Sequence, residues 1–124
     1  MDIYQLGEFG LIEEIKKKFP CKKKSSLLGI GDDAAIINFN NKLTVVSSDM
    51  LIEGIHFDLS YFPLKHLGYK SVIVNLSDIF SMNAKPSQIL LNIAVSSKFR
   101  SDAIHEFYDG VKIACDEYNV DLVG

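Results

Sequence analysis

Acidic residues lie at three places in the sequence: just before an apolar segment, just after another, and within a helical pattern. Asp32 and Asp33 lie side by side in the stretch GIGDDAAII, residues 29–37, just before a predicted strand. Asp49 follows a second apolar run, and Asp78 lies within a long helical pattern that has few other polar residues. An ionised carboxylate that faces protein rather than water needs a partner or takes a raised pKa. These positions are therefore the first candidates for chemistry.

Each acid also has a local explanation. Asp33 can cap a turn, Asp49 can end a strand through a side-chain turn, and Asp78 can bond a neighbouring backbone amide. If the three segments converge on one edge of a small sheet, however, each close pair of carboxylates repels by on the order of several kcal/mol. A hard divalent cation removes that repulsion, and oxygen ligands such as Asp33, Asp49 and the hydroxyls of Ser47 and Ser48 suit Mg²⁺ rather than zinc or copper. Magnesium held by several carboxylates points to a phosphate nearby.

The elements that must position these residues follow from the apolar spacing. Apolar residues recur at helical spacing in three segments, which are residues 8–19, 63–82 and 101–118. Short apolar runs bounded by turn residues predict strands at residues 34–39, 43–48, 52–57, 88–96 and 121–124. Asn40-Asn41 predicts a turn, Asn83 a left-handed helix end and Ser101 a helix N-cap. This order predicts an α+β fold, a two-layer α/β sandwich with a mixed four-stranded sheet.

Length and composition limit the class of protein. The 124 residues are enough for one folding unit, and 48% apolar with 23% charged residues is typical of an ordered globular domain. A net charge of −3 argues against nucleic acid as a general partner. The N-terminal segment resembles neither a signal peptide nor a membrane span, so no membrane partner and a cytoplasmic location are expected. Cys21 and Cys115 have no CxxC spacing and are expected to be free thiols.

Residues 21–26, CKKKSS, form a short basic run. A solvated connector is the expected structure, because charge runs usually face water. A loop that faces an anion is the alternative.

Three motifs, in this order and spacing, resemble a known enzyme family. They are GIGDDAAII, VSSDMLIEGIHF and VNLSDIFSMNAKP. Together they resemble the N-terminal half of the thiamine-monophosphate kinase family, which belongs to the aminoimidazole ribonucleotide synthetase-like superfamily. The resemblance runs from about residue 8 to residue 124. GDD alone is a weak signal, whereas the combination of the three motifs is specific to this kinase family within the superfamily.

The resemblance implies ATP-dependent phosphorylation of thiamine monophosphate to thiamine diphosphate, with several Mg²⁺ ions between the phosphates. The positions that hold the metals in that family match Asp33, Ser47, Ser48, Asp49 and Asp78. His56 matches a residue that contacts thiamine monophosphate, and Tyr108 matches a position near the nucleotide. Asp32 is expected to orient its neighbour or the turn. The alternatives are a histidine packed at a strand end and a tyrosine that belongs to the core.

The chain also departs from that family. Met50 stands where the family usually has threonine, and Asn83 stands where it usually has glycine. In the family, the strand at residues 121–124 continues into a Gly-Asp-Thr motif and then into a second α/β domain that covers the nucleotide. Residues 1–124 are therefore expected to be an N-terminal domain that binds metal and phosphate and forms a dimer. The C-terminal domain is not part of these residues, and full kinase turnover is not expected from them alone.

The resemblance also implies a homodimer, and two other functions remain as alternatives. N-terminal domains of this family pair sheet to sheet across a two-fold axis, and the apolar segments 43–48 and 88–96 fit a homodimer of that kind. One rival is a cation-stabilised dimerisation module without a catalytic role. The other is a different ATP-dependent enzyme of the superfamily, such as a purine-biosynthetic synthetase or a selenophosphate synthetase. Magnesium-dependent binding of nucleotide or thiamine monophosphate separates a kinase domain from a mere assembly module.

Overall fold

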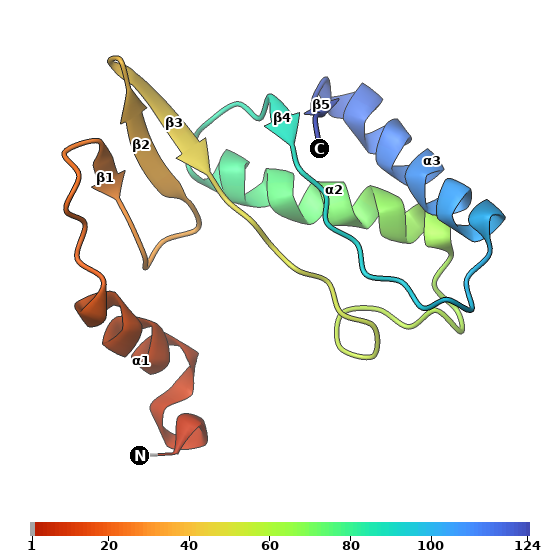
Figure 1. Ribbon diagram of the computed structural model, residues 1–124, viewed down its shortest axis with the longest axis horizontal. Helices are drawn as coiled ribbons and strands as arrows, with labels where there is room; N and C mark the ends of the chain where they lie inside the picture. Colours follow the sequence, from red (N-terminus) through yellow and green to blue (C-terminus); the bar gives the residue numbers. More distant parts are fainter. Residues whose placement is uncertain (1) are drawn as a thin grey trace.

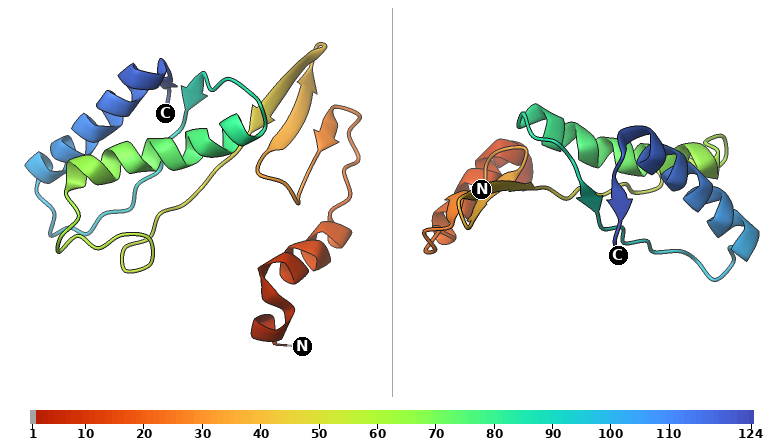
Figure 2. Two further views of the ribbon diagram at one scale, coloured as in Figure 1. Left: turned by 180° about the vertical axis from the view of Figure 1, so that it is seen from behind. Right: turned by 90° about the horizontal axis from the view of Figure 1, so that it is seen from above.

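A computed structural model describes residues 2–124 (Figure 1). The elements follow the chain as α1 (Ile3–Lys18), β1 (Ser26–Leu28), β2 (Ala35–Phe39), β3 (Lys42–Val46), α2 (Leu64–Ser81), β4 (Gln88–Ile89), α3 (Ser101–Tyr118) and β5 (Asp121–Leu122). Helices α2 and α3 lie against each other, while α1 and the three-stranded sheet lie to one side of them (Figure 2). The structure thus has a helical part that holds the core and a sheet that extends from it.

The core is the contact between α2 and α3. Its buried residues are Leu67, Val72 and Leu76 of α2, Phe107, Val111, Ala114 and Cys115 of α3, and Val120 just after α3. The two helices meet at Gly68 and Gly110. A Cβ atom added at Gly68 would lie 1.9 Å from the carbonyl oxygen of Phe107, and one added at Gly110 would lie 1.8 Å from that of Lys65. The helix backbones therefore touch, and only glycine fits at either position.

A polar contact joins the same helices at their exposed side. The hydroxyl of Tyr69 on α2 donates a hydrogen bond to a carboxylate oxygen of Glu117 on α3, at 2.6 Å. This bond to Glu117, more than desolvation, raises the pKa of Tyr69 to about 12. The phenol consequently stays protonated, and the bond stays intact, throughout the neutral range.

The sheet β1-β2-β3 is antiparallel and is built on a tight hairpin. Asn40 and Asn41 have φ values of 49° and 65°, and Phe39 pairs with Lys42 across them. Two positive φ values at the tip of a two-residue loop are the signature of a turn whose twist matches that of the strands. The predicted turn at Asn40-Asn41 is confirmed.

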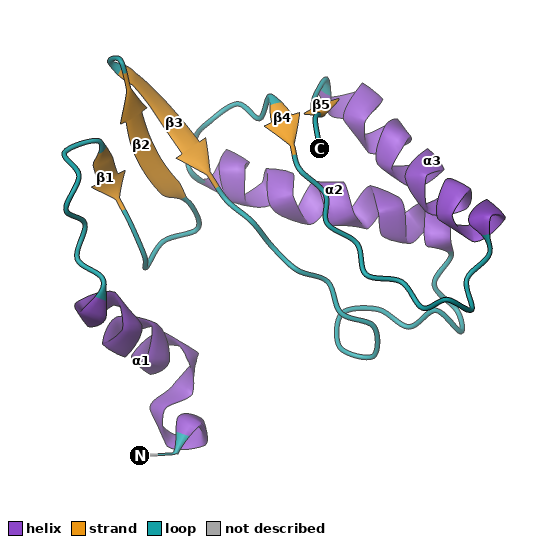
Figure 3. Ribbon diagram, viewed as in Figure 1, coloured by secondary structure: helices purple, strands orange, loops and turns teal. Residues whose placement is uncertain are grey.

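The predicted four-stranded mixed sheet was wrong, although the α+β class is confirmed. The chain forms a three-stranded antiparallel sheet and a separate two-stranded parallel sheet, in which Gln88 pairs with Asp121 and Ile89 with Leu122 (Figure 3). The expected strand at 88–96 stops at Ile89. The amide of Leu91 still donates to the carbonyl of Gly124 at 2.8 Å, but residues 92–96 form no strand, and Leu90 is 75% exposed and Val95 is 55% exposed. The prediction of a buried strand over the whole of 88–96 was therefore wrong, because apolar composition alone does not supply a partner strand.

The segment predicted as a strand at residues 52–57 is a closed turn instead. Gly54 has a φ of 80°, the amides of Ile55 and His56 both donate to the carbonyl of Ile52, and the amide of Gly54 donates to the carbonyl of Phe57. These bonds are local, so the segment cannot extend and pair with a neighbouring strand. The strand predicted at residues 52–57 was wrong, because the apolar residues of this segment lie around a turn.

Some boundaries also differ from the predictions. Strand β1 was missed, because it begins at the end of the basic run and is three residues long. Helix α1 begins at Ile3 rather than at residue 8, with a break at Gly7, whose φ is 70°. Helix α3 has the predicted bounds, but its N-cap is Arg100, which makes no side-chain cap, and not Ser101.

Other predictions hold. Asn83 has a left-handed φ of 55° just after α2, as predicted for a helix end. Cys21 is exposed and Cys115 is buried, and both are free thiols. Desolvation raises the pKa of the Cys115 thiol. Within residues 2–124, no helix combines the length and the apolar character that crossing a bilayer requires.

Replacing Gly110 by alanine is expected to lower the free energy of unfolding by about 2–3 kcal/mol, because the new methyl group overlaps the α2 backbone. The higher helix propensity of alanine offsets about 1 kcal/mol at most. Urea unfolding followed by circular dichroism measures the difference.

The matched control is Gly10→Ala in α1, where the added methyl group meets only the flexible side chain of Leu6. That variant is expected to keep the free energy of unfolding of the unsubstituted chain or to raise it by up to about 1 kcal/mol, because alanine has the higher helix propensity. Equal midpoints for Gly110→Ala and the unsubstituted chain would contradict the backbone contact between α2 and α3.

Candidate functional site

Three segments far apart in sequence meet at the end of the sheet nearest to α2. The hydroxyl of Ser47, just after β3, lies 3.2 Å from a carboxylate oxygen of Asp78 on α2 and 3.1 Å from the carbonyl oxygen of Asp33, just before β2. Ser47 thus links the loop before β2 to the last turns of α2. The predicted residues Asp33, Ser47 and Asp78 are brought together.

Ser81 belongs to the same cluster and was missed in the sequence. Its hydroxyl lies 2.8 Å from a carboxylate oxygen of Asp33 and 2.7 Å from the carbonyl oxygen of Asp78. Ser81 follows Asp78 by three residues on α2, and this spacing puts both on one face of the helix. That spacing was the available signal, but serine on an exposed helix face is too common to single out.

The cluster carries negative charge without a cation to balance it. The ion pairs within residues 2–124 join Lys16 with Glu13, Arg100 with Asp102 and Lys112 with Asp116, so they include neither Asp33 nor Asp78. Asp78 is half-buried and Asp33 is exposed. Two carboxylates, two hydroxyls and two carbonyls are hard oxygen donors, and this set fits Mg²⁺.

The predicted carboxylate cluster is less complete than the sequence suggested. Among the described residues, no three acidic, histidine or cysteine side chains gather closely enough to hold a metal ion by themselves. The carboxylate of Asp49 instead accepts a hydrogen bond from the amide of Met50 at 2.7 Å, which is the local turn contact considered as its alternative. Asp49 and Ser48 follow Ser47 directly in the chain and are exposed. Any ion at this site therefore also needs hydroxyl or carbonyl oxygens.

Asp32 contacts its neighbour. One carboxylate oxygen of Asp32 accepts a hydrogen bond from the backbone amide of Asp33 at 2.8 Å. Gly31, which precedes the pair, has a φ of 122° that side chains rarely tolerate. The glycine and the Asp32 carboxylate together set the direction of the backbone at Asp33.

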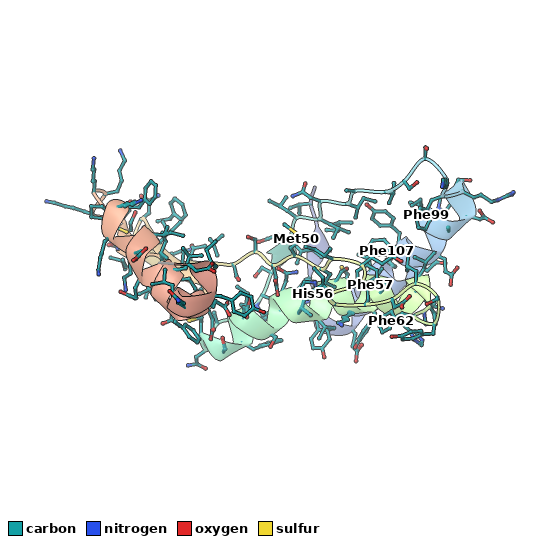
Figure 4. The ribbon with its side chains drawn as sticks, turned by 90° about the horizontal axis from the view of Figure 1, so that it is seen from below. Met50, His56, Phe57, Phe62, Phe99 and Phe107 are labelled. Atoms are coloured by element: carbon teal, nitrogen blue, oxygen red, sulfur yellow. The ribbon has the colours of Figure 1, made fainter. Side chains whose placement is uncertain are left out.

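His56 lies in the turn between β3 and α2, apart from the carboxylate cluster. Met50, His56 and Phe57 follow one another along this segment (Figure 4). The imidazole is exposed, and its Nδ1 accepts a hydrogen bond from the amide of Ile52 at 2.8 Å. The neutral ring therefore carries its proton on Nε2. The ring is not packed at a strand end, which was the alternative for this residue.

Tyr108 lies on α3, where its ring is half-buried and meets Phe107 edge-on with 5.4 Å between centroids. It also lines an open groove of about 680 Å³ with residues of α3 and β5, among them Cys115 and Leu122. Within residues 2–124, no hydrogen bond joins Tyr108 to the cluster around Asp33 and Asp78. Tyr108 thus has one side in the core and one side on a groove.

The sequence from residue 31 to residue 124 matches the family described as AIR synthase related protein, N-terminal domain. This chain belongs to that family. Its curated relatives include the thiamine-monophosphate kinase of Aquifex aeolicus, which is 36% identical over 100% of this chain and 38% of that protein. The thiamine-monophosphate kinase of Buchnera aphidicola subsp. Schizaphis graminum is 38% identical over 97% of this chain and 37% of that protein.

A solved structure shows the same fold at high coverage. The structure of AaThiL complexed with AMPPCP and TMP superimposes with a TM-score of 0.85 and 36% identity, over 100% of this chain and 38% of that chain. The chain thus spans between a third and two fifths of the length of the relatives it matches. The resemblance seen in the three sequence motifs is confirmed.

Replacing Ser81 by alanine removes the hydrogen bond that ties Asp33 to α2. We expect it to lower the free energy of unfolding by about 1 kcal/mol, measured by urea unfolding. Hydrogen exchange at the amides of residues 31–34 should also become faster, because this loop loses its side-chain link to the helix.

Ser77→Ala is the control, since Ser77 is an exposed serine of the same helix. It is expected to change the free energy of unfolding by less than about 0.5 kcal/mol. If both variants leave exchange at residues 31–34 unchanged, Ser81 does not hold the Asp33 loop.

Proposed function

We propose that this chain is the N-terminal domain of a kinase that phosphorylates thiamine monophosphate to thiamine diphosphate with ATP and Mg²⁺. The observation that carries the proposal is the meeting of Asp33, Ser47 and Asp78, which are oxygen ligands without a cationic partner, at the end of the sheet. The ligands of the similar AaThiL structure, AMPPCP and TMP, support ATP and thiamine monophosphate as the substrates.

We assign the metal site to the oxygen donors around Ser47. The proposed ligands are Asp33, Ser47, Ser48, Asp49 and Asp78. Ser47 already links Asp33 to Asp78, and Asp49 uses one carboxylate oxygen in its bond to Met50 and keeps the other. Bound Mg²⁺ would supply positive charge that neutralises phosphate oxygens.

The remaining assignments concern the two substrates. His56 donates from Nε2 to the phosphate of thiamine monophosphate, and Tyr108 contacts the nucleotide from the groove beside α3. Asp32 keeps the backbone of Asp33 in place through the bond to its amide. Phosphoryl transfer requires charge balance and alignment more than covalent chemistry by the protein, so positioning is the main task of these side chains.

The domain arrangement and the location are also proposed. Residues 1–124 form the metal- and phosphate-binding and dimerisation domain, and a C-terminal domain that covers the nucleotide completes the enzyme. Turnover by the chain alone is not expected. Two free cysteines favour a reducing compartment, and we assign the enzyme to the cytoplasm.

A homodimer accounts for the apolar surface that the fold leaves open. Leu43 on β3 is 67% exposed and Leu90 after β4 is 75% exposed. Surface of this kind is stabilised by about 25 cal/mol for each Å² that a partner covers. Among the described residues, the outer edge of β3 and residues 92–96 have no partner strand, so a second copy would complete the sheet.

Calorimetric titration tests the proposed function directly. Thiamine monophosphate and AMPPCP are titrated into the chain with Mg²⁺ and without it. We expect magnesium-dependent binding that Asp78→Asn weakens by about tenfold or more, because the variant loses a charged ligand next to Ser47.

Asp109→Asn, an exposed aspartate on α3, is the matched control and should bind as the unsubstituted chain does. The proposal is falsified if neither ligand binds with Mg²⁺ present, and a dimer that binds neither would favour the non-catalytic assembly module. Binding of another nucleotide-dependent substrate in place of thiamine monophosphate would favour a different enzyme of the superfamily.

Measuring the oligomeric state tests whether the chain forms the proposed homodimer. Analytical ultracentrifugation is expected to find a dimer, and the double variant Leu43→Glu, Leu90→Glu is expected to be a monomer, because two buried charges would face the partner without compensation. Phe9→Glu on α1, at a residue that is 81% exposed, should leave the dimer unchanged. A monomeric unsubstituted chain would contradict the proposed interface.

A further inference from the structure

In the turn that carries His56, the residue after the histidine is packed against the core, whereas the histidine and the residue before it are exposed. Phe57, the next residue, is half-buried and packs against the α2–α3 core. His56 itself is exposed, and Ile55 before it is 74% exposed. The backbone bonds of the turn fix the amides of Gly54, Ile55 and His56, but they leave the carbonyl group and the imidazole of His56 to be held by other contacts.

Two further hydrogen bonds hold the ring and the carbonyl group of His56. The amide of Ile52 donates to Nδ1 of His56 at 2.8 Å, and the ammonium of Lys70 on α2 donates to the carbonyl oxygen of His56 at 2.9 Å. The first bond acts on the ring and the second on the backbone that bears the ring. Lys70 is the contact that joins His56 to α2, the helix that also carries Asp78.

Lys70 is itself held in place. Its ammonium lies 5.6 Å from the centroid of the Phe62 ring, in the segment just before α2. A cation over an aromatic face is attracted to it, which restricts a side chain that otherwise has many rotamers. Lys70 is half-buried. The lysine is thus fixed from two sides, by Phe62 and by the carbonyl of His56.

We propose that Lys70 is the positioning residue for His56. By holding the His56 carbonyl to α2, it keeps Nδ1 bonded to the amide of Ile52 and leaves Nε2–H free to donate to an anionic phosphate oxygen. This inference rests on the proposed function, in which His56 contacts the phosphate of thiamine monophosphate. Lys70 acts through His56 and does not itself contact the substrate.

The first test needs no substrate. In protein labelled with ¹⁵N in its three histidines, ring-nitrogen shifts are measured at about pH 8, where a free imidazole is neutral. His56→Gln assigns the signals. We expect the Nε2–H tautomer for His56 in the unsubstituted chain, a mixture of tautomers in Lys70→Met, and the original tautomer again in Lys70→Arg. Lys65→Met, an exposed lysine of the same helix, is the control and should change nothing.

The second test measures thiamine monophosphate binding by calorimetry with Mg²⁺ present. Lys70→Met is expected to bind about tenfold more weakly, and Lys70→Arg is expected to recover most of the affinity. The double variant Lys70→Met, His56→Gln should bind no more weakly than His56→Gln alone, because both changes remove one contact. AMPPCP affinity should be the same in all variants, which excludes general unfolding.

The two tests separate this inference from the proposed function. If the unsubstituted chain binds no thiamine monophosphate, the proposed function fails, while the tautomer of His56 in Lys70→Met still decides whether Lys70 orients the ring. An unchanged tautomer in Lys70→Met overturns the inference. Unchanged thiamine monophosphate affinity in Lys70→Met also overturns it. The same holds if the losses of affinity from Lys70→Met and His56→Gln add up in the double variant.

Discussion

The contact between α2 and α3 at Gly68 and Gly110 determines where the rest of the structure lies. Because the added Cβ atoms would overlap carbonyl oxygens of the opposite helix, the two backbones approach as closely as atoms allow. This closeness lets Leu67, Val72 and Leu76 pack against Phe107, Val111 and Ala114 in a core that the two helices mainly form. The sheet and the loops are then attached to α2, which carries residues of the candidate site along one side.

Along α2, polar contacts attach the sheet and add to the apolar packing of Phe57 on the α2–α3 core. Ser47 and Ser81 tie the end of β3 and the loop before β2 to Asp78, and Lys70 ties the His56 turn to the same helix. Hydroxyl and ammonium groups in these contacts hold acidic and carbonyl oxygens that ligand binding would also use. A site assembled in this way is pre-arranged but open to a cation, because protein donors hold the carboxylates in position without neutralising them.

The apolar surface shows that the described chain does not cover all of its own hydrophobic segments. Leu90, Ile93 and Val95 after β4 belong to an apolar run yet are exposed, and the outer edge of β3 is unpaired among the described residues. If a second copy pairs with β3, dimerisation would also help to position the candidate site, because Ser47 follows β3 directly. The proposed metal site and the proposed interface thus share one strand.

Local sequence determined the two long helices, the Asn40-Asn41 hairpin and the left-handed Asn83, because spacing and turn chemistry act within a few residues. It also singled out Asp33, Ser47 and Asp78, since carboxylates beside apolar runs are costly unless they are used. Only the tertiary structure decided that Ser81 joins them, that residues 52–57 close into a turn and that residues 92–96 form no strand. Those outcomes depend on which distant segment comes near, and that is determined by the packing of α2 on α3 rather than by any short stretch of residues.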